Sequence, residues 1–458
     1  MGLGKQNNRQ QKLFFTRDEI PRSPGHVFYD RLQSILKQYG FDRHVQDLCE
    51  PYYASGKGRP SIPPGRYFRM HLVGYFEGIE SERGIEWRCA DSLSLREFLL
   101  LDSKEPVPDH SSLSRIRSRL PLELHQEVFN WVLEVLADAG LIQGNRVGVD
   151  ASTMEANAAM RSIVRRDTGE GYRQMLERMA KDSGIQNPSE EDLSRMDRKR
   201  QGKKTSNQDW KAPSDPDARI AKMKDGRTRL AYKPEHAVDL DTGVVVASAI
   251  QHADKGDTKT LYDTLNSAQN ALSTVGKAPI STSKTEVVGD KGYHSREVLK
   301  DFEDGPWKTR IREPKSNTFH SWNGDHQARR AVYNNRQRLK SGKGRESEKL
   351  RTEMVERSNQ HILDRGPMRR TWLRGRANVH KRYLLTVAAF NLSILMRKLI
   401  GVGTPKGAAE IPSGMLLGIQ WSSSTIFIFV VSGDVQIIGA AALHQRRIAE
   451  MATGEGKT

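Results

Sequence analysis

Cysteine is almost absent from this sequence: only Cys49 and Cys89 occur, and they do not form a CxxC pair. Disulfide frameworks and structural zinc sites both need several suitably spaced cysteine or histidine side chains. The sequence gives no sign of either scaffold. It is therefore typical of a protein from a reducing compartment, and we expect a cytoplasmic location.

Long apolar runs are also scarce. The N-terminal residues MGLGKQNNRQQKLFF lack the apolar core of a signal peptide. Residues 411–433 carry no charge, and residues 425–431 read TIFIFVV, but a run of serines interrupts the segment. Its continuous apolar part is far shorter than the roughly 20 residues that a membrane span needs. We expect a β-prone tail here and no membrane partner.

Negative charge is in deficit. Lysine and arginine together number 73 against 56 aspartate and glutamate residues, which gives a formal net charge of +17. Such an excess attracts polyanions over distances set by ionic screening. Nucleic acid is the first partner that this balance suggests, although a basic surface can also serve solubility alone.

The N-terminal part is predicted to be helical. After a basic, flexible segment at 1–28, apolar residues recur at helical spacing from 29 to 141, and a helix is expected at 66–77 after Pro63 and Pro64. Asp109 or Ser111 can cap a further helix with one apolar side. Its other side either contacts DNA phosphates or forms a solvated basic face, and it carries Arg115, Arg117 and Arg119.

The pattern changes to an α/β order from residue 142 to 400. The β-branched run RVGVD ends at Asp150, two β-rich runs flank the turn at 241–243, and the strand EVVGD ends at Asp290. Helices are expected at 257–272, 345–364 and 379–400, with a strand at 309–314. This order predicts an α/β domain with a mixed sheet. A basic, polar stretch at about 155–228 is either an insertion or a disordered linker.

Two predicted strands end in an aspartate, Asp150 and Asp290, which are 290 − 150 = 140 residues apart. Strand ends are where α/β sheets present functional groups. Two carboxylates on neighbouring strands would reach shared divalent cations. Glu356, which is 356 − 290 = 66 residues further on a later helix, is the best placed third ligand. Glu353, one turn earlier, is its rival.

Oxygen ligands of this kind suit Mg²⁺, and we expect Mn²⁺ to substitute. Two such ions about 3.5 to 4 Å apart can activate an attacking oxygen and stabilise a leaving one. The three acidic residues therefore predict phosphoryl transfer by two metal ions.

Six strings support a family resemblance: VGVDAST (147–153), SDPDARIAKMKDGR (214–227), AVDLDTG (237–243), GDT (256–258), VVGDKGYHS (287–295) and VERSNQHILD (355–364). Over residues 29–399 the chain resembles bacterial insertion-sequence transposases of the DDE type. It is most similar to the IS-eleven-eighty-two group, which is allied to the IS-five and IS-four superfamily.

The resemblance implies an RNase H-like catalytic domain with a mixed five-stranded sheet, preceded by a helical N-terminal domain. It implies a catalytic, metal-binding triad of Asp150, Asp290 and Glu356, with terminal inverted repeats and target DNA as substrates. A homodimer on DNA, associated with the nucleoid, is also implied. The tyrosine, arginine and lysine of the superfamily signature around the glutamate are replaced by Lys349, Thr352 and Leu363.

Further basic residues are expected to contact the DNA backbone, since such contacts dominate non-specific affinity. Residues 368–382 gather many of them around Trp372, which either stacks on an unpaired base or packs between helices. The expected contacts beyond the three arginines above are Lys203, Lys204, Lys291, Arg357, Arg369, Arg370, Arg374, Arg376, Lys381 and Arg382.

The tail at 401–458 has no counterpart in the family after about Lys406, so it is either an extra element or altered coding sequence. The sequence also allows two alternatives to a DNA-recombining enzyme. One is a non-catalytic DNA-binding protein or inactive remnant. The other is an RNase H-like nuclease without strand transfer.

Overall fold

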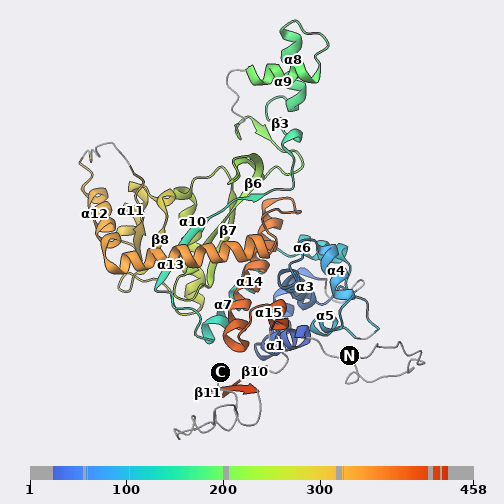
Figure 1. Ribbon diagram of the computed structural model, residues 1–458, viewed down its shortest axis with the longest axis vertical. Helices are drawn as coiled ribbons and strands as arrows, with labels where there is room; N and C mark the ends of the chain where they lie inside the picture. Colours follow the sequence, from blue (N-terminus) through green and yellow to red (C-terminus); the bar gives the residue numbers. More distant parts are fainter. Residues whose placement is uncertain are drawn as a thin grey trace, which may run out of the picture.

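The computed structural model describes residues 24–54, 58, 60–102, 104–199, 206–315, 322 and 324–410, together with the strands at 416–422 and 425–431. Lys203, Lys204, most of the expected N-terminal segment and most of the tail lie outside the described residues. A helical region and a sheet with its helices lie side by side (Figure 1).

The helical region confirms the periodicity seen in the sequence. In α6 (His110–Arg119) the predicted cap forms, since the Asp109 side chain accepts a hydrogen bond from the Ser112 backbone N–H at 2.9 Å. The buried centre of the region is α3 (Pro64–Phe76), where Arg69 forms an ion pair with Asp42 at 2.6 Å. The remaining helices are α1 (Pro24–Gln38), α2 (Phe41–Cys49), α4 (Glu82–Ala90), α5 (Leu93–Phe98) and α7 (Leu122–Asp138), with a 3₁₀ turn, η2 (Glu50–Tyr52).

The central sheet is mixed, as predicted, but it has seven strands instead of the expected five. The two short extra strands, β2 (Met154–Glu155) and β5 (Arg219–Lys222), both pair with β6. The five longer strands run in the order β7-β6-β1-β8-β9, in which β8 and β9 are parallel to β1 and β6 is antiparallel to it. They are β1 (Arg146–Ala151), β6 (Thr228–Asp239), β7 (Val245–His252), β8 (Thr285–Gly289) and β9 (Trp307–Ile311).

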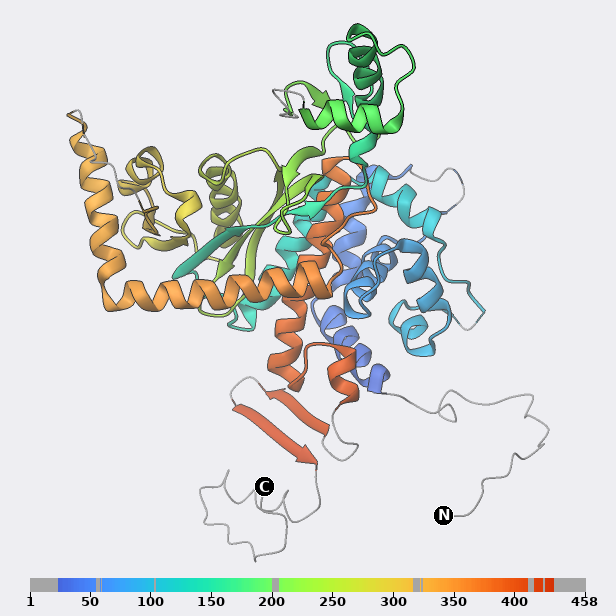
Figure 2. The same cartoon turned by 45° about the horizontal axis from the view of Figure 1, so that its top comes forward.

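The predicted hairpin at 241–243 is confirmed: it joins β6 to β7, and Gly243 has a φ of 80° that favours glycine. The long helix α13 (Gly342–Asn359) contacts β1, β6 and β8 and runs across the sheet (Figure 2). It continues into a π-helical segment, η5 (Gln360–Arg365). The other helices around the sheet are α10 (Asp257–Thr274), α11 (Arg296–Glu303) and α12 (His326–Lys340), with a 3₁₀ turn, η4 (Lys291–Tyr293).

The helix α14 (Arg376–Ile400) joins the two regions. It contacts α3 and α7 on one side and β7 on the other, and it lies between them in Figure 2. Among the described residues, the stretch Arg376–Ala409 is the one that is long and apolar enough to cross a membrane. However, 67% of its most apolar window is buried inside the protein, as expected for a core helix. The short helix α15 (Pro405–Ala409) follows and contacts α1.

The string at 214–227 fixes the start of α14. The buried Asp215 accepts hydrogen bonds from the Tyr232 hydroxyl at 2.7 Å and from the Gly375 backbone N–H at 3.1 Å. Asp217 accepts one from the Arg376 backbone N–H at 2.9 Å. These carboxylates satisfy backbone donors that a helix start leaves unpaired.

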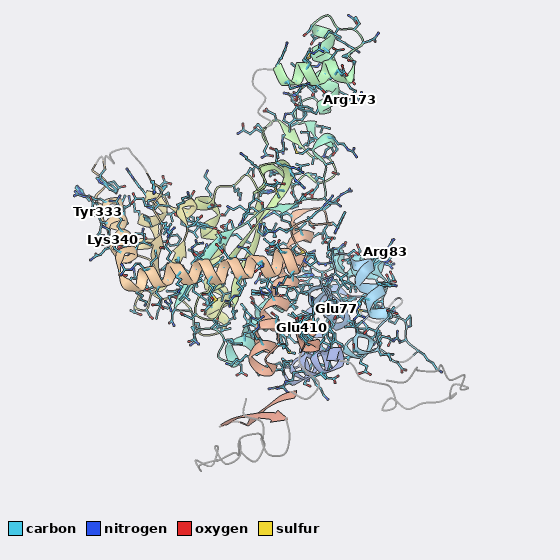
Figure 3. The ribbon with its side chains drawn as sticks, viewed as in Figure 1. Glu77, Arg83, Arg173, Tyr333, Lys340 and Glu410 are labelled. Carbon is cyan, nitrogen blue, oxygen red and sulfur yellow. The ribbon has the colours of Figure 1, made fainter. Side chains whose placement is uncertain are left out.

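The polar stretch at about 155–228 is folded over its described residues, so the disordered-linker alternative does not hold there. It forms a lobe that projects from the sheet, with Arg173 on its surface (Figures 1 and 3). Trp210 is buried in the lobe with its ring centroid 5.5 Å from that of Tyr172. The lobe consists of η3 (Met160–Ser162), β3 (Val164–Arg165), α8 (Tyr172–Asp182), α9 (Glu190–Lys199) and β4 (Trp210–Lys211).

The tail contains a separate antiparallel pair of strands, β10 (Leu416–Ser422) and β11 (Thr425–Val431).

Candidate active site

The register of two parallel strands places Asp150 beside Asp290. Arg146 of β1 pairs with Glu286 of β8, and this offset, 286 − 146 = 140, continues along the ladder. Asp150 and Asp290 have the same offset. Because parallel strands expose their carboxyl ends at the same edge of a sheet, the two aspartates meet there.

The environment of Asp150 opposes its negative charge. The pKa of its carboxyl group is raised to about 6, chiefly by burial and also by the neighbouring charge of Asp290, while Arg351 and Lys224 act in the opposite direction. The Asn359 side-chain amide on α13 donates a hydrogen bond to Asp150 Oδ2 at 3.3 Å. Asp290 is held separately, since its Oδ1 atom accepts a hydrogen bond from the Gly292 backbone N–H at 2.8 Å.

A third carboxylate, Asp257, reaches the same place from the start of α10. A Cβ atom on Gly292 would overlap Asp257 Oδ2 and would lie 3.0 Å from Asp290 Oδ1, so these two carboxylates flank one glycine. Lys233 Nζ forms an ion pair with Asp257 Oδ1 at 2.6 Å. The string GDT at 256–258 contains this residue, but the spacing of the strand-end aspartates does not predict that Asp257 belongs to the site.

A buried polar network lies behind these carboxylates. Glu235 of β6 is fully buried and accepts hydrogen bonds from the Tyr293 hydroxyl at 2.7 Å and the Thr264 hydroxyl at 2.5 Å. The Thr260 hydroxyl donates to it at 3.0 Å and also accepts from Lys233 Nζ at 3.0 Å. Burial raises the pKa of Glu235. The network fixes η4, and therefore Asp290, against α10.

Glu356 is exposed on α13, where it lines a shallow hollow together with Lys349 and Thr352. Glu353, the rival ligand, forms an ion pair with Arg357 at 2.6 Å. Within the described residues, no three histidine, cysteine, aspartate or glutamate side chains converge as a ready metal site. The structure therefore brings two of the three predicted ligands together and leaves the glutamate one turn away from Asn359.

Three of the expected DNA contacts are internal. Arg117, Lys381 and Arg382 are buried, with relative exposures of 6, 7 and 8%. Arg117 pairs with Glu82, Lys381 donates to the Arg117 carbonyl at 3.0 Å, and Arg382 donates to the Glu80 carbonyl at 3.0 Å. Their burial removes them from the set of DNA contacts. They instead join α14 to the helical region.

The other basic residues of that set for which the structure describes side chains are exposed. Some also contact protein groups: the Arg119 guanidinium lies 4.8 Å from the ring centroid of Tyr53, and Arg369 pairs with Asp364 at 2.6 Å. Trp372 is 50% exposed, so part of its ring is accessible, although its Nε1–H also donates a hydrogen bond to Glu80 at 3.0 Å. The exposed members are Arg115, Arg119, Lys291, Arg357, Arg369, Arg370, Arg374 and Arg376.

Three segments of the chain match known protein families. Residues 16–119 match the family described as transposase domain (DUF772), and residues 207–392 match the transposase DDE domain. The second match includes Asp290 and Glu356, whereas Asp150 lies between the two matches. Residues 420–458 match a different family, the SecA DEAD-like domain. No curated protein and no solved structure matches the chain significantly.

Proposed function

Since the chain belongs to the insertion-sequence DNA transposases, as its two transposase domains show, we propose that it cleaves and joins DNA strands at Asp150, Asp290 and Glu356. The observation that supports this assignment most directly is the common offset of the β1–β8 ladder and of the two aspartates. That register is what a shared metal site needs.

The residues at the strand ends fit divalent metal ions. Two adjoining carboxylates, one of which has a pKa raised by burial and by its neighbour, form an oxygen-rich donor set that a cation would stabilise. Asp150 and Asp290 would hold Mg²⁺, or Mn²⁺ in its place, with Glu356 as the third ligand. When bound, a pair of such ions supplies activation of the attacking oxygen and stabilisation of the leaving one.

The chain's own residues would prepare this donor set. Asn359 orients Asp150, and the Gly292 backbone N–H orients Asp290. Glu356 lies three positions before Asn359, and side chains three residues apart are neighbours on the surface of a helix. Its carboxylate therefore lies next to the residue that bonds Asp150. A π-helical segment directly follows Asn359, and such segments are frequent at functional sites.

We assign the catalytic part to the RNase H-like architecture and the chain to the IS-eleven-eighty-two group. The strand order β7-β6-β1-β8-β9, with β8 and β9 parallel to β1, supports the first assignment. The six strings of the sequence support the second.

DNA is the partner of a transposase, and we propose the terminal inverted repeats of the element and a target duplex as its substrates. The exposed basic residues of the candidate set would contact the phosphate backbone. We further propose a homodimer on DNA, in the cytoplasm and at the nucleoid. No observation favours the two alternatives, a non-catalytic DNA-binding protein or a nuclease without strand transfer.

The test is cleavage of a duplex that carries the terminal repeat, with Asp150→Asn as the variant and Asp304→Asn as its control. Asp304 is a surface aspartate paired with Arg330 and has no contact with the site. The control should cleave as the wild type does, whereas Asp150→Asn should bind the duplex without cleaving it. Cleavage by Asp150→Asn at the wild-type rate would remove this residue from the mechanism.

A further inference from the structure

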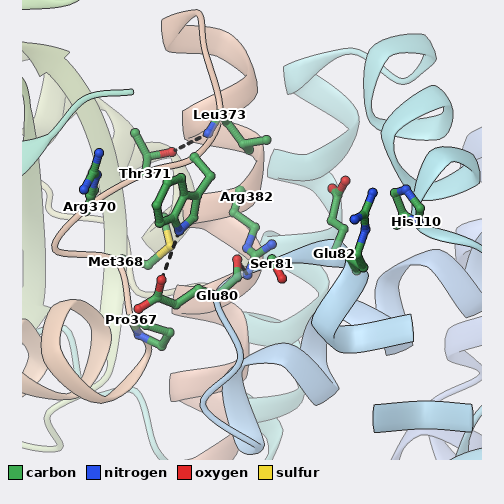
Figure 4. Close-up of a pocket in the computed structure, with 12 residues that line it drawn as sticks. Glu80, Ser81, Glu82, His110, Pro367, Met368, Arg370, Thr371, Leu373 and Arg382 are labelled. Atoms are coloured by element: carbon green, nitrogen blue, oxygen red, sulfur yellow. Dashed lines mark hydrogen bonds between the residues drawn. The ribbon is translucent and has the colours of Figure 1, made fainter. Parts of the chain in front are cut away.

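A pocket of about 240 Å³ opens between the helical region and the segment that follows η5 (Figure 4). Glu80 and Arg83 line it from the start of α4, and Met368, Arg370 and Trp372 line it from the other side. The Trp372 Nε1–H donates a hydrogen bond to Glu80 at 3.0 Å. The Arg370 guanidinium lies 4.7 Å from the Trp372 ring centroid. An exposed aromatic ring thus shares the pocket with an arginine and a carboxylate.

The pocket adjoins the chain that leaves Asp150. The Glu155 backbone N–H donates to the Arg369 carbonyl at 2.8 Å, and its carbonyl accepts from the Thr371 N–H at 2.9 Å. The Asn157 side chain donates to the Trp372 carbonyl at 2.8 Å. Glu155 lies five positions after Asp150, which is at most about 16 Å of extended chain. A DNA strand held at Asp150 would therefore reach Trp372 within a few nucleotides.

We propose that this pocket receives one unpaired base of the DNA end that is processed at Asp150, which rests on the proposed function. Aromatic rings stack on any base and, together with cationic side chains, form the common platform for single-stranded DNA. At about 30 Å³ for each water molecule, a pocket of about 240 Å³ has room for roughly eight waters, which is enough space for one base.

A purely structural role for Trp372 is the rival explanation, because its bond to Glu80 joins the two regions. The two roles need different parts of the side chain. Stacking needs the ring, whereas joining needs the Nε1–H donor. Trp372→Phe keeps a ring and removes the donor, and Glu80→Ala removes the acceptor, so these variants separate the two roles. Trp87, which is 70% exposed on α4 and does not line the pocket, provides the control Trp87→Ala.

The experiment measures the binding of two duplexes in EDTA, one blunt and one with a four-nucleotide overhang that contains 2-aminopurine. We expect the wild type to prefer the overhang about tenfold and to quench the 2-aminopurine fluorescence. Trp372→Ala should lose both effects, whereas Trp372→Phe and Trp87→Ala should retain them. The thermal midpoint of each variant shows that it is folded.

Retention of the preference by Trp372→Ala, or its absence in the wild type, would overturn the inference. Equal losses in Trp372→Phe and Glu80→Ala would show a joining role and would overturn it as well. Cleavage with Mg²⁺ is measured on the same overhang duplex. If the wild type cleaves this duplex but does not capture the base, the pocket proposal is wrong and the proposed function stands. If it captures the base but does not cleave, the pocket proposal stands and the proposed function is wrong.

Discussion

Lys233 Nζ lies 2.6 Å from Asp257 Oδ1, and the other oxygen of Asp257 occupies the space that a side chain on Gly292 would need. Lys233 is itself buried and also donates to the Thr260 hydroxyl at 3.0 Å and to the Lys255 carbonyl at 3.1 Å. A buried cation therefore fixes a carboxylate beside the loop that carries Asp290. This contact explains how the second aspartate is positioned.

Lys233→Met should lower the rate of strand cleavage about 10- to 100-fold, the range typical of residues that orient metal ligands. The substitution removes the partner of Asp257, and the loop at Asp290 then loses its support. The measurement is the cleavage rate at saturating DNA, together with the Mg²⁺ concentration for half-maximal activity, which should rise. Lys233→Arg should restore part of the activity. Identical metal dependence in Lys233→Met and wild type would contradict a positioning role.

Gly292→Ala should impair cleavage more than folding. A methyl group at this position would overlap the Asp257 carboxylate and press on Asp290, so the two carboxylates must move apart. Gly342→Ala is the matched control, because nothing lies within 4 Å of the added methyl group. Cleavage rates and thermal midpoints of both variants provide the comparison, and unchanged cleavage by Gly292→Ala would show that the close approach is unimportant.

Glu356→Gln should abolish metal-dependent cleavage, whereas Glu353→Gln should reduce it only slightly. The first removes the proposed third ligand, and the second removes the partner of Arg357 on the exposed side of α13. Single-turnover cleavage of the terminal-repeat duplex separates the two residues. The reverse order of effects would transfer the role of third ligand to Glu353.

Acid should destabilise the protein through buried histidines. Burial lowers the pKa of His236 to about 3, and His236 Nε2 lies 2.7 Å from the Tyr383 hydroxyl. Since the ordinary value is about 6.5, the stability held by neutral His236 is complete above that pH and is lost as the pH falls from 6.5 towards 3.

Urea unfolding between pH 7 and 4 measures this effect. One histidine contributes up to about 1.4 kcal/mol per pH unit to the slope of the unfolding free energy. His236→Asn should show a slope that is smaller by up to that amount, although the variant is less stable at pH 7. Equal slopes for both proteins would show that His236 is not held neutral in the folded state.

Removal of residues 411–458 should leave strand cleavage unchanged. The DDE match ends at residue 392, and the SecA DEAD-like match occupies residues 420–458. Ending the chain at Gly401 is the contrasting truncation, because it also removes α15, which contacts α1. This shorter protein should unfold several degrees lower. Loss of cleavage in a folded protein that ends at Glu410 would assign the tail a role in catalysis.

Local sequence patterns predicted much of the fold. The start of α6 at Asp109, the β6–β7 turn and the ends of β1 and β8 follow from capping, turn and alternation rules. The offset of 140 residues between two strand-terminal aspartates matches the observed register. These features depend on short segments, and the sequence therefore contains enough information to predict them.

The features that the sequence did not predict depend on packing between segments far apart in the chain. Lys381 and Arg382 belong to a basic run that is typical of a DNA contact. However, both side chains are buried because α14 lies between the two regions. The rotation of α13 about its axis depends on how it packs on β1 and β8, and this rotation leaves Glu356 exposed. Asp257 is acidic at a helix start, where a capping or dipole role is the ordinary interpretation. Only the fold shows that it lies beside Asp290.

Iron-directed cleavage of the polypeptide tests the metal site most directly. Fe²⁺ with peroxide and ascorbate generates hydroxyl radicals that cut the backbone next to a bound ion. We expect cuts near both Asp150 and Asp290, their suppression by excess Mg²⁺, and their loss in Asp150→Asn. Cuts confined to another part of the chain, or a pattern unchanged in Asp150→Asn, would contradict a metal site shared by the two aspartates.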